Sequence, residues 1–270
     1  MQPNQISSTK LSLVTSNIRG QINFQNALNQ YINLDLSIIC LQETHWDSTN
    51  ATFWSQVLHK KGFQSIHSTF NTNSRGSSVL VNTKHKLTID ANKSSIDPNG
   101  FWCLVHIMHE DSPTPLRILA VYSPQAIHQQ TFIKEIENIM SNEPNPIWLV
   151  GDFNNSVDKR DVPQQYMFKT NDKLFINLTD TFEMSDCWWQ HHDKTSSTWF
   201  SSAPIQRLST NLFQYLLMCE DKNYTPVGIK WKVSDINDDS RTLTIDKQSA
   251  KSYISESKHR GSRGVTNKFY

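Results

Sequence analysis

Long apolar runs are missing from this 270-residue sequence. No stretch approaches the roughly 20 apolar residues that a membrane-spanning helix needs. The first ten residues are polar and lack the charged-then-apolar pattern of a secretory signal. We therefore expect an intracellular protein that is not secreted and has no membrane partner, with the nucleus among its compartments.

Cysteine is also scarce, and its spacing excludes two common kinds of site. The four cysteines are widely separated and form no CxxC pair; they are Cys40, Cys103, Cys187 and Cys219. Cys40 and Cys103 lie inside apolar segments, which is typical of reduced core thiols. The pattern indicates neither a zinc site nor a disulfide framework.

The sequence has no large excess of charge of either sign. It contains 26 Lys and Arg and 25 Asp and Glu residues, which gives a net charge of +1. No global electrostatic field points to nucleic acid or a membrane surface. One local basic face would still suffice for DNA. Arg160 and the Lys/Arg-rich C-terminal tail are candidates for such a face, with ordinary solvated surface as the alternative. Nothing in the sequence indicates an oligomer.

Short β-prone runs and amphipathic segments follow one another irregularly along the chain. Strands are expected at residues 11–16, 36–41, 63–70, 77–82, 101–108, 116–122, 146–151, 198–200, 211–219, 227–233 and 243–245. Helices are expected near residues 24–34, 51–61, 129–141 and 172–178, and a loop at 110–115. Several neighbouring strands are joined too closely for βαβ crossovers. The pattern predicts an α/β (α+β) fold of two mixed β-sheets packed as a sandwich with outer helices.

The organisation predicted from composition is a single domain at residues 10–246. Residues 1–9 form an N-terminal extension. Residues 247–270 are rich in Ser, Lys and Arg and almost without apolar side chains. That composition cannot bury a core, so we expect a disordered basic tail.

Polar side chains stand at the ends of four predicted strands: Asn17, Glu43, Tyr122, and Asp152 with Asn154. Each one alone is commonly a turn or cap residue. Together they suit one chemistry, because a hard divalent cation binds carboxylate oxygens and polarises a phosphate. Asn and Tyr can donate hydrogen bonds to phosphate oxygens, where negative charge accumulates in the transition state.

The segments that carry these side chains resemble a known superfamily. They read LVTSN at residues 13–17, ICLQET at 39–44, VYSPQ at 121–125 and LVGDFN at 149–154. Their order and spacing are similar to those of the endonuclease/exonuclease/phosphatase superfamily. Residues 75–81 and 178–200 look most like the endonuclease domains of LINE-type retrotransposons. The resemblance implies a DNase-like two-sheet fold over residues 10–246.

The resemblance also implies a role for each strand-end residue. Glu43 would be the principal ligand of Mg²⁺ (or Mn²⁺), with Asn17 supporting the metal and phosphate site. Tyr122 would contact the scissile phosphate. Asp152 would activate or orient the attacking water, and Asn154 would position the phosphate and the leaving group. Thr198 falls where LINE-type enzymes carry a threonine near the nucleic acid.

The C-terminal third departs from the family pattern at two positions. Ser209 stands where an aspartate is expected, and Ile236 replaces the histidine of a Ser-Asp-His segment. Asp235 matches the aspartate of that segment. Isoleucine can neither transfer a proton nor donate a hydrogen bond, and the loss of a general acid or base typically lowers a rate by about 10²–10⁴.

Three hypotheses about function follow from these observations. The first is a metal-dependent phosphodiesterase that hydrolyses DNA as LINE-type endonucleases do. The second is a catalytically decayed member that keeps the fold and binds nucleic acid or metal. The third is a small-molecule or lipid phosphatase of the same superfamily, against which the LINE-like segments argue.

Overall fold

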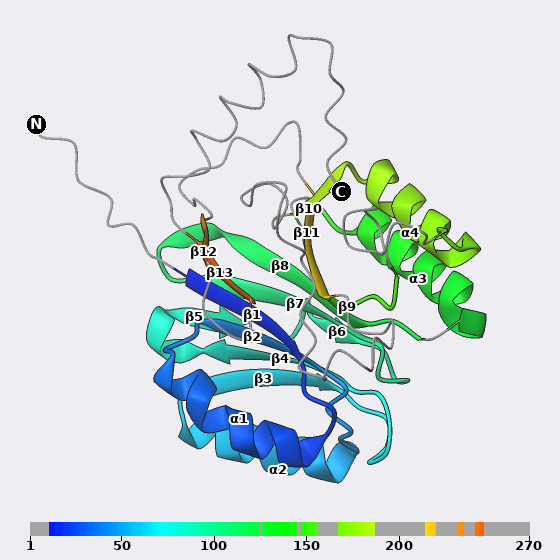
Figure 1. Cartoon of the computed structure of the whole chain (residues 1–270). Helices are drawn as coiled ribbons and strands as arrows, with labels where there is room; N and C mark the ends of the chain where they lie inside the picture. The colour runs from blue at the N-terminus through cyan, green and yellow to red at the C-terminus, as the bar shows by residue number, and fades with distance from the viewer. Residues whose placement is uncertain are drawn as a thin grey trace, which may run out of the picture.

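The computed structural model describes residues 11–124, 126–144, 147–155, 167–186, 214–219, 232–234 and 241–245. Two β-sheets pack face to face, and helices cover both outer faces (Figure 1). This arrangement confirms the predicted two-sheet sandwich with outer helices. The predicted N-terminal extension and basic tail lie outside the described residues.

The first sheet has six strands within the described part of the chain, in the order β12, β13, β1, β2, β4, β3. β1 and β2 are parallel, and the other neighbours are antiparallel. The strand bounds are β1 Leu11–Asn17, β2 Ile38–Gln42, β3 Phe63–Ser68, β4 Ser77–Asn82, β12 Lys232–Ser234 and β13 Arg241–Ile245.

The second sheet has seven strands among the same residues, in the order β10, β11, β9, β8, β7, β5, with β6 also paired to β7. Here β8 and β9 form the parallel pair. The strand bounds are β5 Leu87–Ile89, β6 Ser95–Ile96, β7 Trp102–His109, β8 Ser112–Tyr122, β9 Ile147–Asp152, β10 Met184–Asp186 and β11 Gln214–Cys219. Each sheet thus contributes one parallel pair to the centre of the sandwich.

Four α-helices are described, together with two 3₁₀ turns. Their bounds are α1 Gln21–Asn33, α2 Ser48–Lys60, α3 Gln129–Asn142, α4 Thr170–Thr181, η1 Thr83–His85 and η2 Ala126–His128. Helix α2 begins after Asp47, whose Oδ1 accepts a hydrogen bond from the Asn50 amide at 2.8 Å. Among these described helices none is long and apolar enough to cross a membrane.

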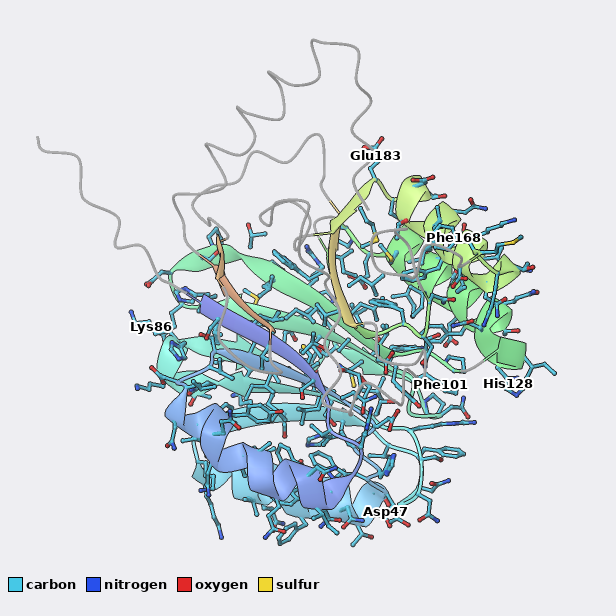
Figure 2. All side chains as sticks on the ribbon, in the orientation of Figure 1. Asp47, Lys86, Phe101, His128, Phe168 and Glu183 are labelled. Carbon is cyan, nitrogen blue, oxygen red and sulfur yellow. The ribbon has the colours of Figure 1, made fainter. Side chains whose placement is uncertain are left out.

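Three apolar layers hold the sandwich together, and they explain why the central strands are apolar on both faces. The layer between the sheets includes Leu13 and Cys40 from the first sheet and Val105, Ala120 and Trp148 from the second. Figure 2 shows these inner faces filled by side chains. The outer layers are made by helices α1 and α2 on the first sheet and α3 and α4 on the second.

Most predicted elements are present, and the differences have local causes. The expected loop at residues 110–115 is wrong, because β8 begins at Ser112 and only a tight turn separates it from β7. At the start of β8, Ser112 Oγ accepts a hydrogen bond from the Thr114 amide at 3.4 Å. The short strands β5 and β6 were not predicted, since two or three residues give no periodicity. The predicted strand at residues 198–200 lies outside the described residues.

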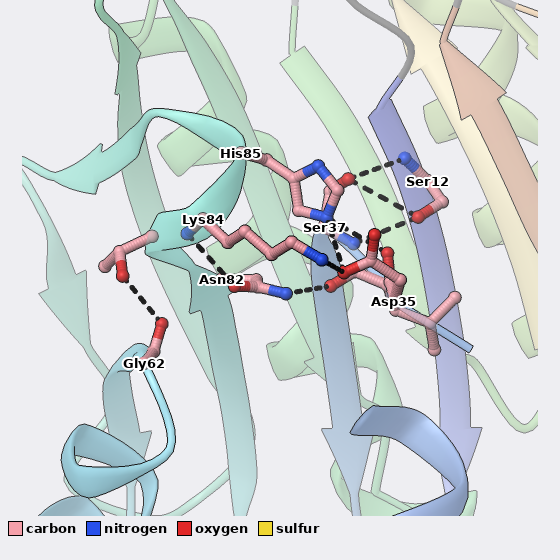
Figure 3. Close-up of polar contacts among 9 residues, drawn as sticks. Ser12, Asp35, Ser37, Gly62, Asn82, Lys84 and His85 are labelled. Atoms are coloured by element: carbon pink, nitrogen blue, oxygen red, sulfur yellow. Dashed lines mark hydrogen bonds and ion pairs between the residues drawn. The ribbon is translucent and has the colours of Figure 1, made fainter. Parts of the chain in front are cut away.

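Side chains also fix the end of the first sheet at which β1 and β2 begin (Figure 3). Asn82 Nδ2 donates to the Leu36 carbonyl at 3.1 Å, and Lys84 Nζ lies 3.1 Å from Asp35 Oδ1. The opposite end, where β1 and β2 finish, carries the polar side chains identified in the sequence.

Gly151 permits an unusually close approach inside the second sheet. It lies in β9 opposite Val121 of β8 and has φ +138°, a backbone conformation that favours glycine. A Cβ atom at this position would collide with the Val121 carbonyl oxygen. The absence of a side chain at Gly151 therefore allows β9 to pack closely against β8 immediately before Asp152.

We expect Gly151→Ala to lower the free energy of unfolding by about 3 kcal/mol, from steric overlap and an unfavourable φ together. Denaturant unfolding measures the change. The matched control is Gly62→Ala, which also has positive φ but whose added Cβ would meet only Thr83 Oγ1, at 3.8 Å. Its expected cost is about 1 kcal/mol, and equal losses in the two variants would contradict the steric explanation.

Candidate active site

The ends of the two parallel strand pairs bring four predicted site residues together. In the first sheet Asn17 ends β1 opposite Gln42, and Glu43 follows directly. In the second sheet Tyr122 ends β8 opposite Asp152, which ends β9. Parallel strands that finish in register place their last side chains at one edge, where α/β proteins commonly bind ligands.

One amide group joins the two sheets at this edge. Asn17 Nδ2 donates to Glu43 Oε1 at 3.0 Å and to Asp152 Oδ2 at 2.9 Å. Asn17 Oδ1 in turn accepts from the Arg19 amide at 3.2 Å, which fixes the orientation of the carboxamide. The two carboxylates, 109 positions apart in the sequence, are thereby held on either side of a single side chain.

The segment after β2 holds Glu43 through its backbone. Glu43 has φ +51°. Its carbonyl accepts from the Gly20 amide at 2.7 Å, and the Thr44 amide donates to the Gly76 carbonyl at 3.2 Å. A Cβ on Gly76 would overlap the Thr44 hydroxyl, so glycine is required for this approach. The carboxylate is therefore positioned by a backbone that is tied on both sides.

Asp152 is almost fully buried, with 1% of its surface exposed. Burial raises the pKa of its carboxyl to about 7, and the negative charge of Glu43 adds to the rise. Hydrogen bonds from Asn17 and from the Asn154 amide, at 3.2 Å to Oδ1, oppose the shift. The site thus holds a carboxyl group that exchanges its proton near neutral pH.

Tyr122 is half-buried beside the same two acids. Burial raises the pKa of its phenol above the ordinary value. This pKa is raised further by Glu43, through its negative charge and its hydrogen bond with the phenol, and by the negative charge of Asp152. The hydroxyl consequently stays protonated and remains a hydrogen-bond donor at neutral pH.

Asn154 turns the chain away from the site in a left-handed conformation with φ +50°. Its Nδ2 donates to the Ser123 carbonyl at 2.7 Å, so its side chain links the loops that follow β8 and β9. The buried Gln129 strengthens this link, because its Nε2 donates to Ser123 Oγ at 3.2 Å and to the Phe153 carbonyl at 3.1 Å. Gln129 was not identified from the sequence, where it is one polar residue at the start of an amphipathic helix.

A histidine also lies at the site. His45 Nε2 is 3.8 Å from Glu43 Oε2, and a Cβ on Gly20 would approach His45 Nδ1 to 3.1 Å. No histidine near the motif was predicted from the sequence as a site residue, although His45 follows Glu43 by two residues. That short spacing was the available signal, and the positive φ angles of Glu43 and His45, +51° and +54°, accompany the approach of the two side chains.

The donor set suits a divalent cation. Glu43 and Asp152 share a neutral amide as their common partner, and within the described residues no Lys or Arg nitrogen lies within 4 Å of either carboxylate. Two neighbouring carboxylates without a cation repel each other. In the described ranges no group of three or more His, Cys, Asp or Glu side chains is arranged so that it could hold a metal ion. Two neighbouring carboxylates are still enough for a divalent cation that keeps several water ligands.

The remaining predicted residues fall outside the described part of the chain. They are Arg160, Thr198 and Asp235, together with Ser209 and Ile236 at the divergent positions. Their assignment therefore remains a prediction from the sequence.

Many solved structures share the fold of this chain. A 3′ phosphatase from Neisseria, described as bound to a product DNA hairpin, has a TM-score of 0.62 at 15% identity, covering 88% of this chain and 99% of that one. An AP endonuclease from Archaeoglobus fulgidus has a TM-score of 0.63 at 12% identity, covering 88% and 99%. The endonuclease domain of TRAS1, a telomere-specific non-LTR retrotransposon, has a TM-score of 0.58 at 12% identity, covering 88% and 98%. At these identities the likeness shows the fold.

Family membership comes from the sequence itself. A comparison with curated protein sequences finds no match to this chain. A family model, by contrast, matches residues 14–210, which include the ends of both parallel strand pairs and the amide that joins them. The chain belongs to the Endonuclease/Exonuclease/phosphatase family.

Proposed function

We propose that this protein is a divalent-metal-dependent phosphodiesterase that hydrolyses DNA. The observation that supports it most strongly is the Asn17 amide held between the Glu43 and Asp152 carboxylates, at 3.0 and 2.9 Å. A cation ligand and a proton acceptor are thus fixed beside each other. Hydrolysis of a phosphodiester needs both functions at one phosphate.

In this proposal Glu43 is the principal ligand of Mg²⁺ (or Mn²⁺). The bound ion would polarise the phosphate oxygens and lower the pKa of a bound water. Asn17 keeps the Glu43 carboxylate in place through its hydrogen bond. Asp152 accepts the proton of the attacking water, and its pKa of about 7 suits a general base at neutral pH.

Tyr122 and Asn154 act on the phosphate itself. The protonated phenol of Tyr122 donates a hydrogen bond to a non-bridging oxygen, whose negative charge grows in the transition state. Asn154 positions the phosphate and the leaving group from the loop that it shares with Ser123. Thr198 and Arg160 contact the substrate, and Asp235 completes the catalytic set.

DNA is the proposed substrate on two grounds. The segments at residues 75–81 and 178–200 resemble those of LINE-type endonucleases. The structural neighbours include a 3′ phosphatase bound to a product DNA hairpin and two endonucleases. These are properties of the neighbours, and they make DNA the first substrate to test.

A second candidate function is binding of metal or DNA with little turnover. The observation that favours it is Ile236, which replaces the expected histidine, together with Ser209 in place of an aspartate. A site that keeps Glu43 but lacks the histidine would bind a cation without efficient chemistry. Such a protein would still be stabilised by Mg²⁺, because a ligand of the folded state shifts the unfolding equilibrium.

A plasmid-nicking assay with Mg²⁺ tests the proposal. We expect the wild type to nick, and Glu43→Gln and Asp152→Asn each to lower the rate by about 10²-fold or more, through loss of the metal ligand or of the proton acceptor. The matched control is Asp35→Asn, an exposed carboxylate at the far end of the first sheet (Figure 3), which leaves the rate unchanged.

Two results would contradict the assignment. Nicking that survives both site substitutions would show that another site or a contaminant is responsible. Release of phosphate from a small phosphomonoester without any nicking would instead favour the phosphatase alternative.

Ile236→His separates the first two candidate functions. If turnover is limited by the missing histidine, restoring it raises the nicking rate by roughly 10²-fold, the usual contribution of a general acid or base. The comparison is made in the wild-type and Glu43→Gln backgrounds, and the gain is expected in the first alone. An unchanged rate in both would indicate that residue 236 does not face the phosphate.

The raised pKa of Asp152 predicts a dependence of stability on pH in EDTA. The folded state holds this proton up to about pH 7, whereas the ordinary pKa is 3.8. The carboxyl therefore contributes most stability at low pH, and the contribution is lost as the pH rises through 7. Asp152→Asn removes this titrating group. The free energy of unfolding of the variant, relative to that of the wild type, should therefore increase by roughly 2–3 kcal/mol between pH 5 and pH 8. Urea unfolding at both pH values measures this growth, and a constant difference would contradict it.

A further inference from the structure

Arg75 contacts two aromatic rings at the edge of the candidate active site. Its Cζ lies 4.2 Å from the centroid of the Phe70 ring and 4.4 Å from that of Phe101. Both distances are within the range of a cation–π contact. The guanidinium thus contacts two rings from different loops, which restrict the positions that the side chain can adopt.

The stack lies on the same side of the sandwich as the site. Arg75 and Gly76 immediately precede β4, whose first residue pairs with Gln42 next to Glu43. Phe101 immediately precedes β7, whose first residue, Trp102, pairs with Val121 next to Tyr122. The His45 amide donates to the Arg75 carbonyl at 2.9 Å. The Arg75 backbone is thus bonded directly to the segment that carries Glu43.

Phe101 is held in place by a buried carboxylate. Asp97, 2% exposed, accepts from the Phe101 amide at 2.9 Å through Oδ2 and from the Asn99 amide at 3.0 Å through Oδ1. The Gly76 amide donates to the Gly100 carbonyl at 3.1 Å and ties this loop to the one that carries Arg75. The position of Phe101 next to Arg75 is therefore fixed by hydrogen bonds within the protein and does not require a ligand.

The charge of Arg75 has no carboxylate partner among the residues that the structure describes. In the described part of the chain, the one hydrogen bond of its guanidinium runs from Nη1 to the Asn99 carbonyl, at 3.4 Å. A guanidinium that is held by two rings and has no carboxylate partner in the described residues can bind a phosphate. Its place near Tyr122, the proposed partner of the cleaved phosphate, suits a neighbouring phosphate of the same strand.

On the basis of the proposed function, we propose that Arg75 binds a backbone phosphate of the DNA strand adjacent to the phosphate that is cleaved. The planar guanidinium presents paired N–H donors that match two phosphate oxygens. Because the rings already hold the side chain, binding costs little rotamer entropy. The competing explanation is that Arg75 only joins two loops by cation–π contacts.

Binding of a short labelled duplex in EDTA, where no hydrolysis competes, tests the assignment. Dissociation constants are measured between about 50 and 200 mM salt. We expect Arg75→Gln to weaken binding about tenfold at the lowest salt. The slope of log K against log salt should become shallower by about 0.9, the value for one lost phosphate contact.

Two further variants separate charge from structure. Arg75→Lys keeps the positive charge but loses the paired N–H donors of the guanidinium. The salt slope should therefore stay close to that of the wild type while the affinity falls. Lys86→Gln removes an exposed cation from the opposite end of the molecule (Figure 2) and leaves affinity and slope unchanged. Thermal unfolding of each variant reports any loss of the fold.

The possible failures are distinguishable. If the wild type does not bind DNA, both the proposed substrate and the role of Arg75 are overturned. If the wild type binds and Arg75→Gln keeps the wild-type slope, the role of Arg75 alone is overturned and the nicking proposal stands. A lower melting temperature with an unchanged slope would establish the purely structural role.

Discussion

The hydrogen bonds from Asn17 to Glu43 and Asp152 are the contact on which the arrangement of this molecule depends. They join two sheets that pack mainly through apolar side chains, with a few other polar contacts such as that of Ser77 Oγ with the Ala120 carbonyl. A neutral donor can satisfy one oxygen of each carboxylate without cancelling their charge. The edge of the sandwich therefore retains a local excess of negative charge, which favours a cation.

Keeping that excess charge buried has an energetic cost that the rest of the fold must offset. Asp152 is 1% exposed, and Glu43 and Asn154 both adopt positive φ. Residues in such conformations typically cost about 1–3 kcal/mol each. The three apolar layers supply the compensating stability. The hydrogen bonds of the Thr44 backbone amide and of the Gln129 side chain hold the segments in place. Strain gathered at one edge is typical of a functional site.

Much of this could be predicted from residue patterns. The apolar runs before Asn17, Glu43, Tyr122 and Asp152 identified four strands, because period and length are local properties. The irregular spacing of strands and helices identified the sandwich. The start of β8 at Ser112 was missed, since its first residues read SPTP and show no apolar alternation. Gln129 and His45 were missed as site residues because their significance depends on partners elsewhere in the chain.

The sequence by itself determined the family, the strand ends and the identities of the acidic and amide side chains. Those features follow from local composition and motif spacing, which need no coordinates. Only the tertiary structure decided that one Asn17 nitrogen lies between two acids from different sheets. It also brought Arg75 into contact with both Phe70 and Phe101, two residues that are 31 positions apart in the sequence. Both depend on how the two sheets pack, which is set by apolar layers and strand register rather than by any single segment.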